Sequence, residues 1–156
     1  MSKNVKIDAI DRRILEIIQR DASHSIQDIG EQFGLSTNPC WRRIKRMEDA
    51  GIIERRVAIL NPVKLGLGVT AFVSIRTNKH TPDWLASFAA GILGIPEIIE
   101  CHRMSGDVDY LLKIAVADIA HYDRIYQELI AVVPGLSDVS STFSMERLKY
   151  GTALAI

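Results

Sequence analysis

The segment from Ser25 to Gly51 constrains the fold of this chain more than any other stretch. Its apolar residues recur at helical spacing in two blocks that are separated by a few small residues. Gly34 follows the first block and can take the left-handed conformation that ends a helix. Either Ser36 or Asn38 caps the second helix, and Pro39 falls in its first turn, where a missing N–H costs little. The pattern predicts a helix-turn-helix.

The second helix of this pair is basic on the side that does not pack inward. Its apolar face consists of Cys40, Ile44 and Met47. Basic side chains neutralise phosphates, an arginine can read guanine, and the polar groups at a helix start can bind phosphate. The pattern therefore predicts double-stranded DNA as a partner, with Trp41 either on the sugar backbone or partly buried in a structural role. The candidate DNA-binding residues are Ser36, Thr37, Asn38, Trp41, Arg42, Arg43, Lys45 and Arg46.

Another helix is expected before the pair, from about Asp8 to Arg20. Asp8 can cap it with Asp11 three residues further on, and isoleucines recur along one side of it for burial. Ser25 and Asp28 resemble a capping box for the next helix. Three short helices are thus expected to share one small core.

A strand is expected after the helix-turn-helix, because apolar and polar residues alternate from Ile52 to Leu60. Such a strand is either a wing, with Arg55 or Arg56 near phosphate, or a solvated strand edge. The Asn-Pro pair at 61–62 breaks the pattern. We expect a winged helix-turn-helix DNA-binding domain over residues 1–60, a linker over 61–68 and a second domain over 69–156.

The second domain is predicted to alternate strands and helices. The expected order is a strand at 69–76, a helix at 82–93, strands at 98–104 and 110–116, a helix at 119–132 and a strand at 139–148. This βαββαβ order is typical of a ferredoxin-like antiparallel sheet with both helices on one face, so the fold class is α+β. A second copy that covers the open face would make a homodimer, which also suits the two half-sites read by helix-turn-helix proteins.

Two motif groups in this order resemble the Lrp/AsnC family, the leucine-responsive or feast/famine transcriptional regulators. The first is LSTNPCWRRIKRMEDAGIIE with LNP behind it, and the second is ECHRMSGDVDYLLK followed by PGLSDV. The resemblance implies a winged helix-turn-helix, a ferredoxin-like ligand-sensing domain, dimers and often octamers, and control by an amino-acid effector or related metabolite. Asn38, Trp41 and Met47 depart from the residues usual in the family, which leaves the operator sequence open.

The turn at Gly106, Asp107 and Asp109 matches the effector loop of that family. Glycine lets the backbone approach a ligand, and an acidic side chain with exposed amides can receive both ends of a zwitterion. The alternative is a plain hairpin turn. Polar residues on one face of the last strand are weaker candidates for the same effector-binding pocket, namely Ser140, Thr142 and Ser144.

Composition excludes several other classes of protein. The chain has 47% hydrophobic and 24% charged residues, a formal net charge of zero and two cysteines, which suits a globular cytoplasmic protein with reduced thiols. No secretory or membrane-spanning pattern occurs, and no nucleophile, cofactor or metal pattern was found, so we expect no cofactor and no enzyme activity. The favoured function is a ligand-responsive DNA-binding regulator. The alternative is a metabolite-binding oligomerisation module whose helix-turn-helix serves protein contacts.

Overall fold

The computed structural model describes residues 5–133 and 135–156, which form two units. The chain up to Ile59 builds the first unit together with Lys149–Ile156, and Leu60–Leu148 build the second. Residues 1–4 of the expected first domain and Pro134 of the PGLSDV motif lie outside the described residues. Within the described part of the chain, no helix is long and apolar enough to cross a membrane.

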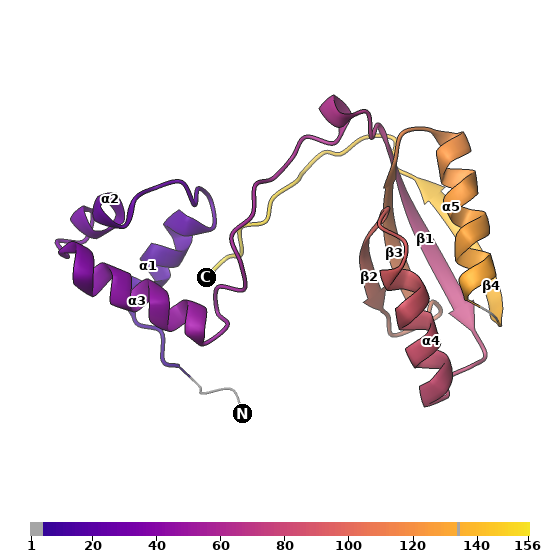
Figure 1. The fold of residues 1–156 in the computed structure, drawn as a ribbon, viewed down its shortest axis with the longest axis horizontal. Helices are drawn as coiled ribbons and strands as arrows, with labels where there is room; N and C mark the ends of the chain where they lie inside the picture. Colours follow the sequence, from indigo (N-terminus) through magenta and orange to yellow (C-terminus); the bar gives the residue numbers. More distant parts are fainter. Residues whose placement is uncertain (1–4, 134) are drawn as a thin grey trace. The chain divides into compact units, whose positions relative to one another are not determined.

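The first unit is a bundle of three helices: α1 (Ala9–Ile18), α2 (Ile26–Glu31) and α3 (Thr37–Asp49) (Figure 1). Both expected capping boxes are confirmed, because Asp8 and Ser25 each accept a hydrogen bond from the backbone N–H three residues later. The carboxylates of Asp11 and Asp28 in turn accept a hydrogen bond from the backbone N–H of the cap residue. These caps satisfy N–H groups that a helix start would otherwise leave unpaired.

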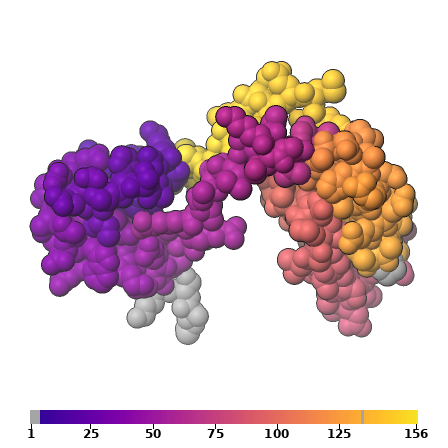
Figure 2. Space-filling view, turned by 45° about the horizontal axis from the view of Figure 1, so that its top comes forward, coloured from indigo at the N-terminus to yellow at the C-terminus, as the bar shows by residue number. Residues whose placement is uncertain are grey.

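The core of the first unit is small and made by all three helices. The three helices form one closely packed body in the space-filling view, coloured indigo to purple (Figure 2). Burial of this apolar surface holds helices that are too short to be stable alone. The buried residues are Ile14, Ile18, Ile29, Cys40, Ile44 and Met47.

The segment that follows α3 differs from the expectation. The predicted strand from Ile52 to Leu60 is wrong, because none of the described residues between 50 and 68 belongs to a strand. Alternation gives a segment two faces but provides no partner for its backbone, and a strand forms only where a neighbour completes the hydrogen bonds. Val57 and Leu60 are accordingly exposed, and a short 3₁₀ turn, η1 (Val63–Leu65), follows.

The second unit is a four-stranded sheet with two helices. Its elements are β1 (Val69–Thr77), α4 (Pro82–Leu93), β2 (Ile98–Arg103), β3 (Tyr110–Val116), α5 (Ile119–Val132) and β4 (Leu136–Phe143). The strand order is β2-β3-β1-β4, and every neighbouring pair is antiparallel. This arrangement confirms the predicted ferredoxin-like α+β unit (Figure 1).

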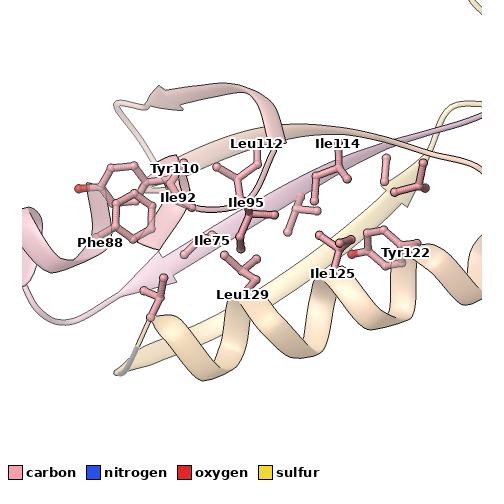
Figure 3. Packing of buried hydrophobic residues seen from close by; sticks show 14 of the residues in the cluster. Ile75, Phe88, Ile92, Ile95, Tyr110, Leu112, Ile114, Tyr122, Ile125 and Leu129 are labelled. Carbon is pink, nitrogen blue, oxygen red and sulfur yellow. The ribbon is translucent and has the colours of Figure 1, made fainter. Parts of the chain in front are cut away.

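One face of the sheet carries the core of the second unit. Side chains of β1 and β3 point toward α5, where Tyr122, Ile125 and Leu129 meet them (Figure 3). On the same face of the sheet, α4 contributes Phe88 to this core. The centroid of its ring lies 4.2 Å from the centroid of the Tyr110 ring. Because both helices cover the same face, the opposite sheet face bears no helix (Figure 1).

The last strand ends earlier than expected. The Ser144 backbone N–H donates to the Thr70 carbonyl at 2.9 Å, and β4 stops at Phe143 instead of continuing to residue 148. Residues from Lys149 onward belong to the first unit. There the Gln19 side chain exchanges two hydrogen bonds with the Leu154 backbone, at 2.9 and 2.8 Å.

Candidate functional site

The turn between α2 and α3 depends on two glycines. Gly34 has a φ of 64°, the left-handed conformation expected from the sequence. Gly30 was not singled out by the sequence, yet a Cβ at this position would lie only 2.7 Å from the Leu35 carbonyl oxygen. The Leu35 N–H donates to the Gly30 carbonyl at 3.0 Å, which folds the turn closely over the end of α2. The two glycines together determine the direction in which α3 begins relative to α2.

The start of α3 is exposed and polar. Ser36 occupies the N-cap position, and its hydroxyl makes no capping hydrogen bond to the described first turn of α3. Thr37 and Asn38 follow in the first turn and are exposed. The first N–H groups of a helix have no partner within the helix and favour anions. This end of α3 therefore suits a phosphate.

The buried and exposed sides of α3 are opposite each other. Cys40, Ile44 and Met47 are buried as predicted. At 3.6 residues per turn, the opposite side carries a row of exposed side chains in which the Trp41 side chain is 48% exposed. Trp41 is therefore not part of the buried core of the first unit. The row consists of Asn38, Trp41, Arg42 and Lys45.

The four basic residues of α3 are not equivalent. Arg43 donates from Nη1 to Asp8 at 2.6 Å and to Asp11 at 2.8 Å, and Arg46 donates to the other oxygen of Asp11 at 2.5 Å. Lys45 pairs within the helix with Asp49 at 2.7 Å. For Arg42, no ion-pair partner is found among the described residues. Of the four predicted phosphate contacts, Arg42 is thus the one left without an internal partner.

The ion pairs change the ionisation of their members. The hydrogen bond from Arg43, together with that from the Asp11 backbone, lowers the pKa of Asp8 from 3.8 to about 2. Hydrogen bonds to Asp8 and Asp11 raise the pKa of Arg43 above its ordinary value. A hydrogen bond to Asp49 likewise raises the pKa of Lys45. The charged forms of Asp8, Arg43 and Lys45 are therefore favoured by these hydrogen bonds.

The wing residues do not form the expected strand, and Arg56 pairs with Glu48 of α3 at 2.9 Å. Such an exposed pair contributes little to stability. Its effect here is to hold the chain that leaves α3 against the end of that helix. Arg55, the other residue that we expected near phosphate, is exposed.

The predicted effector loop lies between β2 and β3. Gly106 has a φ of 116°, a conformation that residues with a Cβ rarely adopt. Asp107 is exposed, and no hydrogen bond to its side chain is found within the described residues. The loop is closed by the Met104 N–H, which donates to the Asp109 carbonyl at 2.8 Å.

The second acid of the loop is already bound. The Asp109 carboxylate accepts a hydrogen bond from the Thr77 N–H at 2.8 Å, and its own N–H donates to the Ile75 carbonyl at 3.0 Å. Thr77 is 4% exposed, and its hydroxyl donates to the Gly135 carbonyl at 3.2 Å. Asp109 therefore ties the loop to the end of β1. Sequence reasoning missed Thr77, because nothing in a strand-terminal threonine distinguishes it locally.

The polar residues predicted on the last strand are spread along it. Ser140 lies opposite Ser74 and Thr142 opposite Phe72, both on the sheet face without helices. Asp138 is level with Arg76 at the loop end of the sheet, so Ser144 is six positions further along, about 20 Å at the usual rise per residue. Of the three, Ser140 is nearest the loop, and the structure does not bring Ser144 beside it.

Within the described residues, no group of three or more histidine, cysteine or acidic side chains comes together as a metal site would require. His121 instead accepts from the Ala117 N–H at 3.4 Å and lies 3.2 Å from Glu97. Of the two cysteines, Cys40 is buried and Cys101 is exposed, and both are free.

The helix-turn-helix with its exposed basic residues and the antiparallel sheet unit together define a class: a helix-turn-helix DNA-binding protein with a second domain of ferredoxin-like fold. Two family models match, one described as winged helix-turn-helix DNA-binding over residues 7–54 and one as the Lrp/AsnC ligand binding domain over residues 70–154. The chain belongs to the Lrp/AsnC family. It is a DNA-binding transcriptional regulator whose activity is modulated by a small effector.

Relatives of known name and structure agree with this assignment. The chain is 47% identical over 150 residues to the DNA-binding transcriptional activator DecR of Escherichia coli, covering 96% of this chain and 99% of that protein. A crystal structure of an AsnC family transcriptional regulator from Agrobacterium tumefaciens is 51% identical, with a TM-score of 0.90 and coverage of 95% and 96%. A transcriptional regulator of Neisseria meningitidis in complex with L-Met is 31% identical, with a TM-score of 0.89 and coverage of 96% and 97%.

Proposed function

We propose that the outward side of α3 is the surface of this regulator that contacts DNA. The observation that carries the assignment is that this side is exposed and polar while the opposite side is core. Arg42 is the expected main contact, since its guanidinium has no internal partner among the described residues and can bind phosphate or guanine. Arg43 and Arg46 hold the helix in place. The direct contacts are Ser36, Thr37, Asn38, Trp41, Arg42 and Lys45.

The test compares Arg42→Ala with Arg124→Ala, which removes an exposed arginine from α5 and serves as the matched control. Binding is followed by fluorescence anisotropy, with a duplex that the native protein has selected from a random-sequence pool. Arg42→Ala should weaken binding and lower the slope of log affinity against log salt by about 1, since one phosphate contact is lost. Unchanged affinity in a folded Arg42 variant would remove this face from the interface. A native protein that does not prefer the selected duplex at any salt concentration would instead favour the protein-contact alternative.

We infer that the effector is an amino acid and that it binds at the loop containing Gly106 and Asp107. The backbone at Gly106 is open to approach, and the free Asp107 carboxylate suits an ammonium group. A structural relative of 31% identity was solved with L-Met, which supports an amino acid as the ligand class. In this proposal Asp109 shapes the loop through Thr77, Ser140 is a nearby contact, and Thr142 and Ser144 contribute at most through another chain.

A thermal-shift series with the amino acids tests the effector class, because a ligand of the native state must raise its stability. The positive amino acid is then titrated against Asp107→Asn, with Asp123→Asn on the exposed side of α5 as the control for loss of one acid. The Asp107 variant should lose most of the thermal shift and keep DNA affinity, whereas the control keeps both. A full shift in Asp107→Asn would exclude this carboxylate from the site.

We further propose that the chain forms a homodimer through the sheet face without helices, and octamers from such dimers. Phe72 is 38% exposed on this face, and a symmetric partner would cover it while pairing two α3 helices for two half-sites. Light scattering after size exclusion should give at least twice the mass of one chain. Phe72→Glu should lower that mass, and Ile130→Glu, on an exposed position of α5, should not. A native protein with the mass of a single chain would contradict the proposal.

We propose the following domain roles and location for this regulator. Residues 1–60 serve as the DNA-binding domain, 61–68 as the linker and 69–156 as the effector and oligomerisation domain, whose last eight residues pack with the first unit. The protein acts in the cytoplasm without enzymatic activity and without a cofactor. What supports the absence of catalysis is that the named relatives are transcriptional regulators.

A further inference from the structure

Among the described residues, Asp11 is the charged residue that is fully buried. It lies in the first turn of α1, and its side chain is fully buried. One oxygen accepts from Arg43 at 2.8 Å, and the other accepts from Arg46 at 2.5 Å and from the Asp8 N–H at 3.1 Å. A buried carboxylate is costly unless it is paired and hydrogen-bonded, and both conditions are met here.

Both arginines come from α3 and are three residues apart, so they lie on neighbouring turns of one flank of that helix. The buried residues Cys40, Ile44 and Met47 determine which side of α3 faces inward. Within that limit hydrophobic contacts have no direction and tolerate repacking, whereas even a small rotation of α3 would break the hydrogen bonds of both guanidiniums to Asp11. The two ion pairs therefore fix the angular setting of α3 more finely than the core does.

We propose that Asp11 is a positioning residue for DNA recognition, which sets the rotation of α3 through Arg43 and Arg46 and does not itself touch DNA. The inference rests on the proposed assignment of the outward side of α3 to DNA. Hydrogen bonds from side chains to base edges require a defined direction, whereas phosphate attraction does not. Loss of the angular setting should therefore reduce specificity more than non-specific affinity.

The charge balance sharpens this expectation. Asp11 places one negative charge between two of the four cations on α3 from its buried position. Asp11→Asn removes that negative charge, keeps the shape and releases Arg46 from its ion pair to reach a phosphate, while Arg43 keeps its pair with Asp8. Binding to a random duplex should then stay level or become stronger. Binding to the selected duplex should weaken, and the ratio of the two affinities should fall at least tenfold. A purely structural role would instead lower both affinities in proportion to the unfolded fraction.

The experiment measures both affinities of the full chain at one salt concentration by fluorescence anisotropy. Asp49→Asn is the matched control, since it makes the same charge change on the exposed end of α3, where Asp49 pairs with Lys45. In the control, both affinities should rise together and the ratio should persist. If the ratio also persists in Asp11→Asn, or if both affinities of that variant fall in parallel, the proposal is overturned.

A second variant keeps the test decisive if Asp11→Asn does not fold. Arg46→Lys keeps the charge but loses the planar fork that reaches the buried oxygen, so the ratio should fall while circular dichroism stays native. An unchanged ratio in a folded Arg46→Lys variant overturns the proposal on its own. Arg42→Ala distinguishes failure of this proposal from failure of the proposed DNA contact by α3. If α3 does not contact DNA, Arg42→Ala leaves the DNA affinity unchanged.

Discussion

In both the α3 helix and the effector loop, some of the like-charged side chains are bound within the protein and another is exposed. The interactions that bind them differ between the two regions. On α3, Arg43 and Arg46 are bound by side-chain carboxylates while Arg42 has no such partner among the described residues. In the loop, Asp109 is bound by a backbone N–H while Asp107 is exposed. Ion pairs respond to charge, salt and pH, whereas a bond from a backbone amide depends mainly on the strand that carries it. The stability of the first unit should thus depend more strongly on charge-changing substitutions, salt and pH than the stability of the second unit.

The largest effect is expected when both arginine partners of Asp11 are removed. Arg43→Met with Arg46→Met leaves a fully buried carboxylate unpaired, which should destabilise the first unit by about 3 kcal/mol, the lower end for a broken buried pair because Arg46 is partly exposed. Native-state hydrogen exchange at the amides of α3 and β3 measures the two units separately. Protection should fall in α3 and persist in β3.

Arg42→Met is the control for this change, because it removes a guanidinium that pairs with no acid in the described chain and should stay within about 0.5 kcal/mol of the native protein. Adding Asp11→Asn to the double variant should recover part of the loss, since the buried charge is then gone. Equal protection in the double variant and the native protein would mean that the ion pairs carry no stability.

A smaller effect is expected when the corresponding bond of the effector loop is removed. Asp109→Ala leaves the buried Thr77 N–H without its acceptor, which should cost about 1–3 kcal/mol in the second unit. Asp107→Ala should change stability by less than about 0.5 kcal/mol, because its side chain is exposed. The free energy of unfolding, measured by urea denaturation at low and high salt, shows whether the Asp109 contact acts as a hydrogen bond or through its charge. If the cost of Asp109→Ala shrinks strongly with salt, the loop is held by charge and the contrast with α3 fails.

The sequence predicted the elements well where the signal is local. The capping boxes at Asp8 and Ser25, the turn at Gly34 and the helices of the second unit follow from patterns of three or four residues. The strand at Ile52–Leu60 was wrong because a strand needs a partner, and alternation does not reveal one. The sequence also does not show which basic residues of α3 form ion pairs and which do not. This difference depends on Asp11, which lies 32 residues before Arg43 and had been interpreted only as part of a helix cap.

An acid titration should reveal a weaker part of the α3 arrangement. The pKa of Asp8 is about 2 in the folded protein against 3.8 ordinarily, so its ionised form is favoured by folding. The stability it contributes is complete above about pH 4 and is lost as the pH falls toward 2. Asp8→Asn should therefore flatten the decline of the denaturation midpoint between these values, and the two proteins should converge at the acid end. Parallel curves for the two proteins would show that Asp8 has no shifted pKa.

The smallest effect is expected at the contact of the C-terminal segment, where an uncharged side chain binds the backbone. Gln19 exchanges two hydrogen bonds with the Leu154 backbone, but the pair is exposed, and water replaces such bonds at little cost. Gln19→Ala should lower the stability of the first unit by less than about 1 kcal/mol. Residues 149–156 should nevertheless become easier to cleave, because cleavage depends on local opening and not on global unfolding. Limited proteolysis with mass spectrometry measures this rate, and Gln27→Ala on α2, whose side-chain amide donates to Glu31 of the same helix, is the control. If both variants are cleaved at the native rate, the Gln19 contact does not hold the segment in solution.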